Sequence, residues 1–203
     1  YALPGQSLAE FERDLDQALA LDPPHLSIYQ LTLEPNTVFA KYPPRGLPDD
    51  ELAFDMLDLI IARTAAAGLE RYEVSAFAKA GYRCEHNLNY WQFGDYLGIG
   101  AGAHGKLSFP HRVIRQTRFR DPVQYIERAL AGHALAHDEE LGREQLPFEF
   151  MLNATRLKDG FELLRFGERT GLSLAALQRG LDQAERRGLI GRDFARAWPT
   201  PRG

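Results

Sequence analysis

Cysteine is nearly missing from this chain of 203 residues, which contains a single one, Cys84. One thiol excludes an internal disulfide, and it excludes a zinc or iron–sulfur site built from several cysteines of this chain. Scarce cysteine is typical of proteins from a reducing compartment, so we expect a cytoplasmic protein.

Long apolar runs and a surplus of positive charge are also missing. No stretch approaches the roughly 18 apolar residues of a membrane-spanning helix, and the first residues do not resemble a signal peptide. The formal net charge of −4 gives no general field that attracts nucleic acid. We therefore expect no nucleic-acid partner and no integral membrane segment, and we leave peripheral membrane contact open.

Apolar residues are nevertheless abundant enough to build a core. They make up 44% of the chain, which argues against disorder and is compatible with one large domain or two small ones. The chain begins at Tyr1 without a methionine and ends in Pro-Thr-Pro-Arg-Gly. We expect it to be an internal piece of a longer protein.

In the first half, segments with strand and helix patterns alternate. Ser7 and Glu10 have the spacing of a capping box in front of a helix, and a second helix is predicted to start near Asp49. Strands are predicted over residues 25–33 and 71–77. With short loops between them, these segments predict parallel βα units of an α/β fold, in which ligands bind at the C-terminal ends of strands.

The second half predicts a different order of strands and helices. Residues 113–119 predict an edge strand, a helix should follow Asp121-Pro122, and residues 139–157 predict a longer helix. Residues 161–190 predict a helix, a turn, a helix and a strand, as in a winged-helix module. We therefore predict two domains, 1–138 and 139–203.

The window from Gly81 to Gly105 holds the single cysteine, two of the six histidines, one of the two tryptophans and five closely spaced glycines after residue 93. Residues 100–105 match the pattern G-x-G-x-x-G, but no helix pattern follows, as a dinucleotide site would require. A glycine-lined strand that approaches another cofactor is the better interpretation. The alternative is a purely structural role, in which a strand needs small residues for packing.

Three side-chain types in this window can bind haem iron. Cys84, His86 and Tyr90 offer a thiolate, an imidazole and a phenolate, and all three occur as axial ligands. His86 could equally act as a general acid or base. Alternatively, His86 and Asn87 form hydrogen bonds within the loop, while Tyr90 and Trp91 plug the end of a barrel.

Two further sites receive little support. His133 and His137 are four residues apart, but Gly132 makes a shared helix face, and hence a zinc site, improbable. The second helix of residues 161–190 carries arginines that could contact DNA, but acidic residues among them weaken a DNA-binding interpretation.

The same window resembles a known family. Residues 72–91 read Y-E-V-S-A-F-A-K-A-G-Y-R-C-E-H-N-L-N-Y-W, and residues 95–105 read D-Y-L-G-I-G-A-G-A-H-G. With Y-A-L-P-G-Q at the start and S-I-Y-Q-L-T-L-E-P-N-T at 27–37, the chain resembles the C-terminal half of the HemW family of radical S-adenosylmethionine proteins. H-N-L-N-Y-W is similar to the H-N-x-x-Y-W motif that separates this family from true coproporphyrinogen dehydrogenases.

The resemblance implies a fold and a function. The fold is α/β: the second half of an incomplete (βα) TIM-like radical SAM barrel, followed by a small helical, winged-helix-like C-terminal domain. The function is to bind haem and deliver it to acceptor haemoproteins. The alternative is an oxygen-independent coproporphyrinogen III oxidase, whose partner is a porphyrin precursor, and a DNA-binding winged-helix regulator is a third class.

The resemblance also implies site residues and cofactors. The haem-binding residues would be Cys84, His86, Asn87, Tyr90 and Trp91. Thr32 and His104 would line a pocket for S-adenosylmethionine. The family's [4Fe-4S] cluster is held by a C-x-x-x-C-x-x-C loop that this chain does not contain. We therefore expect the chain alone to be inactive as an enzyme.

Overall fold

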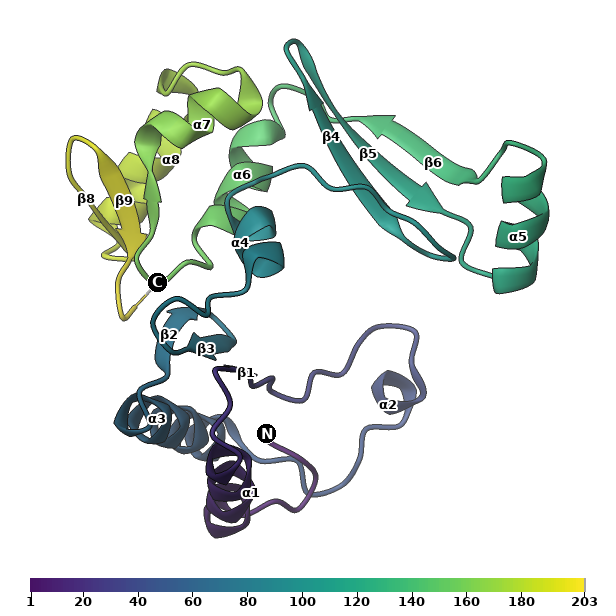
Figure 1. Cartoon of the computed structure of the whole chain (residues 1–203). Coiled ribbons are helices and arrows are strands. Elements are labelled where there is room, and N and C mark those ends of the chain that lie inside the picture. The colour runs from purple at the N-terminus through teal and green to yellow at the C-terminus, as the bar shows by residue number, and fades with distance from the viewer. Residues whose placement is uncertain (203) are drawn as a thin grey trace. The chain divides into compact units, whose positions relative to one another are not determined.

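The computed structural model describes residues 1–202, which form two compact units (Figure 1). The first unit ends at Cys84 and the second begins at Glu85. The predicted domain boundary at 138/139 lies within strand β6 (Leu135–Glu140) of the second unit, and the division into two domains there stays a prediction. No helix in residues 1–202 combines the length and the apolar character needed to cross a bilayer.

Two helices of the first unit begin where the sequence predicted. α1 (Leu8–Ala20) starts with a capping box, in which the Ser7 hydroxyl accepts from the backbone of Glu10 and the Glu10 carboxylate accepts from the backbone of Ser7. α3 (Asp50–Ala66) is capped by the side chain of Asp49. A short helix, α2 (Val38–Lys41), lies in the loop before α3. α1 and α3 pack together through an apolar core that includes Phe11, Leu15, Met56 and Ile60.

The first unit has a small sheet whose strand order is β1 (His25–Ser27), β3 (Ala76–Ala78) and β2 (Glu70–Glu73). Both neighbours run antiparallel to β3, so the prediction of parallel pairing is wrong for these strands. The strand predicted over 71–77 is interrupted at Val74 and Ser75, and a connection of two residues can join only antiparallel strands. The strand predicted over 25–33 ends after three residues.

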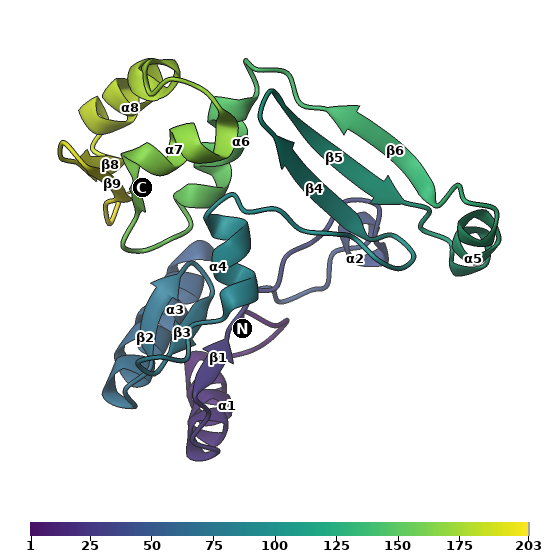
Figure 2. The same cartoon turned by 45° about the horizontal axis from the view of Figure 1, so that its top comes forward.

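The second unit begins with helix α4 (Glu85–Trp91) and a meander of three antiparallel strands (Figure 2). These are β4 (His104–Phe109), β5 (Arg112–Arg118) and β6. The prediction of an edge strand at 113–119 is wrong, because β5 pairs on both sides. Residues 139 and 140, predicted to start a helix, belong instead to β6. Helix α5 (Pro122–Leu130) joins β5 to β6 and is capped by Asp121, as predicted.

The rest of the second unit confirms the winged-helix-like arrangement. Its elements are α6 (Leu146–Ala154), β7 (Phe161–Glu162), α7 (Leu163–Thr170), α8 (Ala175–Arg186), β8 (Ile190–Arg192) and β9 (Arg196–Pro199). The last three strands form a sheet in the order β7-β9-β8. The Phe150 ring lies at the centre of the core and meets Phe93, Phe161 and Phe166 edge to face.

Candidate functional site

The glycine segment after α4 forms a turn before β4, and not the glycine-lined strand that residues 100–105 predict. Gly100 and Gly102 adopt positive φ angles, and the chain then enters β4 at His104. A Cβ on Gly98 would lie 2.3 Å from the carbonyl oxygen of His104, which no side chain tolerates. The glycines therefore allow a tight turn and a close backbone approach, and the match to a nucleotide fingerprint is coincidental.

Helix α4 carries the H-N-L-N-Y-W segment, and its second asparagine fixes the end of the helix. The side-chain amide of Asn89 donates to the backbone carbonyl of Asp95 at 2.9 Å. The backbone carbonyl of Asn89 accepts from the backbone N–H of Gly94 at 2.7 Å. A Cβ on Gly94 would lie 2.0 Å from Asn89 Oδ1. Asn89 therefore holds the backbone after α4 in place, a role that our sequence analysis did not assign.

A row of three rings runs from α4 towards β4. The His86 ring meets the Tyr90 ring edge-on at 4.8 Å, and Tyr90 lies 4.3 Å from Tyr96, measured between ring centroids. Residues 86 and 90 are four apart on a helix, which places them on one face. His86 is exposed, whereas Tyr90 and Tyr96 are half-buried. We call His86, Tyr90 and Tyr96 the aromatic row.

The other predicted haem-binding residues have different surroundings. Trp91 stacks under the guanidinium group of Arg156, which lies 4.2 Å from the ring centroid, and its indole nitrogen is buried without a hydrogen-bond partner. Asn87 is half-buried on α4. Cys84 is the last residue of the first unit, and its backbone N–H donates to the Tyr72 hydroxyl. Trp91 therefore has a packing role in the second unit.

The two residues predicted to bind S-adenosylmethionine lie in different units. Thr32 is exposed in the loop after β1, where its hydroxyl donates to the carbonyl of Gln30 at 3.3 Å. His104 is exposed at the start of β4, opposite Thr117 of β5. Their role stays a prediction.

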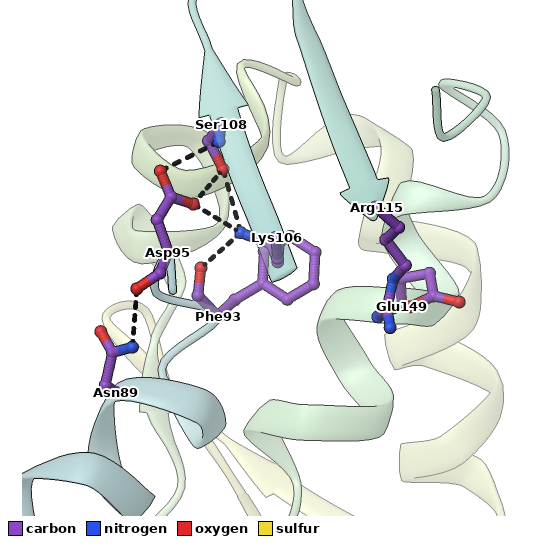
Figure 3. A network of polar contacts seen from close by, with 7 residues as sticks. All are labelled: Asn89, Phe93, Asp95, Lys106, Ser108, Arg115 and Glu149. Carbon is purple, nitrogen blue, oxygen red and sulfur yellow. Dashed lines mark hydrogen bonds and ion pairs between the residues drawn. The ribbon is translucent and has the colours of Figure 1, made fainter. Parts of the chain in front are cut away.

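Lys106 lies at the centre of a buried network of polar contacts (Figure 3). Lys106 on β4 is only 2% exposed, and its ammonium group donates to the Phe93 carbonyl, to the Asp95 carboxylate and to the Ser108 hydroxyl. Burial lowers the pKa of Lys106, while the hydrogen bond to Asp95 acts in the opposite direction. Burial tends to raise the pKa of Asp95, but hydrogen bonds from Ser108 and Lys106 together hold that pKa below its ordinary value.

The network ties the segment after α4 to strand β4. Lys106 pairs with Tyr96 through backbone hydrogen bonds in both directions, so the third ring of the row is held by the same strand. These residues are not among the sites that the sequence predicts. One sequence signal points to the network: Lys106 lies two positions before Ser108, and alternate residues of a strand share one face of the sheet.

Arg115 of β5 forms an ion pair with Glu149 of α6 beside this network (Figure 3). Arg115 and Glu149 both interact electrostatically with the half-buried Tyr96 hydroxyl, whose pKa is raised by burial and lowered in part by Arg115. The pair therefore lies at the Tyr96 end of the aromatic row.

The weaker alternatives gain no support. Among residues 1–202, no group of three or more histidine, cysteine or acidic side chains could hold a metal ion. In the winged-helix-like part, Arg192 pairs with Asp182 and Glu185 of α8. Carboxylates on the helix that would read DNA disfavour contact with phosphates.

Comparison with known proteins shows what this chain resembles. A model of the HemN C-terminal domain matches residues 141–203. The heme chaperone HemW of Escherichia coli (strain K12) is 45% identical over 191 residues, which are 94% of this chain and 49% of that protein. HemW of Bacillus subtilis (strain 168) is 35% identical over 210 residues, which cover 100% of this chain and 54% of that protein. The chain is therefore similar over nearly its whole length to about half of a HemW protein, and over residues 141–203 to the HemN C-terminal domain.

A solved structure confirms the fold of this chain. Coproporphyrinogen III oxidase (HemN) from Escherichia coli, described as a radical SAM enzyme, matches with a TM-score of 0.74 and 18% identity. The match covers 98% of this chain and 50% of the HemN chain. It confirms the α/β class and the radical SAM type of fold. The chain spans about half the length of the curated HemW proteins it matches.

Proposed function

We propose that this chain supplies a haem-binding surface to a haem chaperone that passes haem to acceptor haemoproteins in the cytoplasm. The support comes from the relatives named heme chaperone HemW and from the exposed imidazole of His86 at one end of an aromatic row. Imidazole is a common axial ligand of haem iron, and flat aromatic rings pack favourably against a porphyrin.

Exposure of the ligand suits transfer. A carrier must release its cargo to another protein, so its iron ligand has to be reachable by that protein. His86 is exposed, while the half-buried Tyr90 beside it limits the orientations of the imidazole ring. We assign Asn87, Tyr90 and Trp91 to the surroundings of His86, and Cys84 as a weaker second ligand.

A [4Fe-4S] cluster does not fit the residues of this chain. Such a cluster needs several thiolates, and the chain has one cysteine. We assign the cluster to the part of the full-length protein outside this chain, and Thr32 and His104 to the binding of S-adenosylmethionine in that protein.

The first test of this proposal is haem titration of the full-length protein with His86→Ala. We expect the variant to lose most of its haem affinity and to shift the Soret band, because an iron ligand is removed. His111→Ala, which removes another exposed histidine of the same unit, should behave as wild type. Equal affinity and equal spectra for His86→Ala and wild type would exclude His86 as a ligand.

The alternative function is anaerobic oxidation of coproporphyrinogen III, and the fold similarity to HemN favours it. Turnover of coproporphyrinogen III by the reconstituted full-length protein under anaerobic conditions distinguishes the two. We expect haem binding without turnover.

A further inference from the structure

We propose that Arg115 binds a carboxylate group of the tetrapyrrole, and that Glu149 forms an ion pair with Arg115 when no ligand is present. This inference rests on the proposed function, because it supplies the second anchor for a haem that His86 binds through iron. Haem is amphipathic: an aromatic macrocycle carries two propionate groups on one edge, and a cation beside that edge stabilises the bound state.

Position is the first argument. The aromatic row runs from His86 through Tyr90 to Tyr96, with ring-centroid separations of 4.8 and 4.3 Å. Lys106 is the cross-strand partner of Arg115 and pairs on its other side with Tyr96, so Arg115 lies near the Tyr96 end of the row and not near His86. An iron ligand at one end and a guanidinium at the other match the two chemistries of haem.

Spare donors are the second argument. A guanidinium has five N–H donors in a planar fork that matches a carboxylate. In the described residues, only Nη2 of Arg115 has a hydrogen-bond partner, the carboxylate of Glu149. The Nε atom of Arg115 is buried and has none. The Arg115 side chain is 37% exposed, so a ligand can reach the outer nitrogens.

Charged side chains gather around Arg115. Lys106 lies close enough to Arg115 and Arg169 for both to disfavour its charged form, so three cationic groups are gathered here. The carboxylates that pair with them are Asp95, bound to Lys106, and Glu149, bound to Arg115. Glu139, the cross-strand partner of Arg115, adds a third carboxylate, so the cluster carries no net charge and an anionic ligand has to replace a carboxylate that is already there.

The rigid setting of Arg115 completes the case. Its backbone pairs with Lys106 on one side and with Glu139 on the other, in the central strand of the meander. The side chain therefore starts from a fixed backbone, as a positioned anchor requires. Glu149 is 23% exposed on α6 and keeps the guanidinium oriented between binding events.

The test compares haem with its dimethyl ester, in which both propionates are neutral, on full-length wild type and Arg115→Gln. We expect Arg115→Gln to weaken haem binding roughly 10- to 100-fold, the loss typical of a charge-assisted hydrogen bond, and to leave binding of the ester unchanged. Arg192→Gln is the matched control, since it removes another ion-paired arginine of the same unit. It should change neither affinity.

A second variant keeps the inference testable if Arg115→Gln does not fold. Glu149→Gln removes the internal competitor but retains the shape of the side chain, and it should tighten binding of haem and not of the ester. Equal losses for haem and ester in Arg115→Gln, or no effect of either variant, would refute the Arg115 assignment. If the Arg115 assignment is refuted but wild type still binds haem, the proposed function is retained. If wild type binds neither haem nor the ester, the proposed function and the Arg115 assignment are both refuted.

Discussion

Lys106 and Asp95 show how single residues hold this site together. A lysine that is 2% exposed would be strongly unfavourable without partners, and here its ammonium group has three. One partner is a backbone carbonyl just after α4, so the network links the helix that carries His86 to the sheet that carries Arg115. Loss of Asp95 should therefore affect stability and site geometry together.

The pH dependence of this network can be predicted from the direction of one pKa shift. Hydrogen bonds from Ser108 and Lys106 outweigh burial and hold the pKa of Asp95 below its ordinary value of about 3.9. A carboxylate whose pKa is lower in the folded chain than in the unfolded chain stabilises the folded state at pH values above its pKa in the unfolded chain. This stabilisation is lost as the pH falls through its pKa in the folded chain. Asp95→Asn should therefore be less stable than wild type at neutral pH, by about 1 kcal/mol given the partial exposure of Asp95.

The measurement is urea unfolding of both proteins between about pH 7 and pH 2.5, which spans the region below the ordinary carboxyl pKa. The difference in unfolding free energy should be constant at neutral pH and shrink below about pH 4. Asp55→Asn, which alters an exposed carboxylate of α3, is the control and should give no such change. A difference that persists unchanged to the lowest pH would contradict the assignment.

At the residue scale, the sequence predicts the aromatic row better than the charged groups. His86 and Tyr90 are four residues apart within one recognisable segment, so the pattern finds them together. Lys106, Arg115 and Glu149 come from β4, β5 and α6, and their meeting depends on strand pairing and helix packing. No local pattern encodes such contacts.

At the scale of elements, helix starts were predicted well because capping is local. Ser7 with Glu10, Asp49, and Asp121 followed by proline each cap the helix that they indicated. The hairpin at Val74 and Ser75 lacks glycine, proline, asparagine and aspartate, and Ser75 alone is too weak a turn signal to interrupt the apparent strand. The predicted helix start at Glu139 and Glu140 is wrong, because acidic residues suit the first turn of a helix and also an exposed strand such as β6.

The turn between α4 and β4 gives a prediction about glycine. Gly98→Ala would put a Cβ 2.3 Å from the oxygen and 2.6 Å from the carbon of the His104 carbonyl, and backbone atoms cannot move aside. We expect a loss of roughly 1–3 kcal/mol in unfolding free energy, as for other overpacked sites. Gly180→Ala is the control: it lies within α8 with no heavy atom within 4 Å of the new Cβ.

The control should change stability in the opposite direction. Alanine is favoured over glycine in a helix by about 0.5–1 kcal/mol, so Gly180→Ala should stabilise the second unit. Chemical denaturation of the two variants and wild type measures both effects. Gly98→Ala with unaltered stability would show that the turn adapts freely and that this glycine is not required.

At the scale of the whole molecule, the two units have separate cores. Leu15, 3% exposed, belongs to the core of the first unit, and Phe150, 0% exposed, belongs to that of the second. Both tryptophans, Trp91 and Trp198, lie in the second unit. Tryptophan fluorescence therefore reports the second unit alone, while far-ultraviolet circular dichroism reports both.

This separation predicts how core mutations act on unfolding. Leu15→Ala should cost roughly 2–5 kcal/mol in the first unit and Phe150→Ala roughly 3–5 kcal/mol in the second. If the units unfold independently, Leu15→Ala lowers the denaturant midpoint of part of the circular dichroism signal and leaves the fluorescence midpoint in place. Phe150→Ala lowers the fluorescence midpoint. If Leu15→Ala instead shifts the fluorescence midpoint as far as the circular dichroism midpoint, the two cores form one cooperative unit, and the haem-binding surface draws its stability from both.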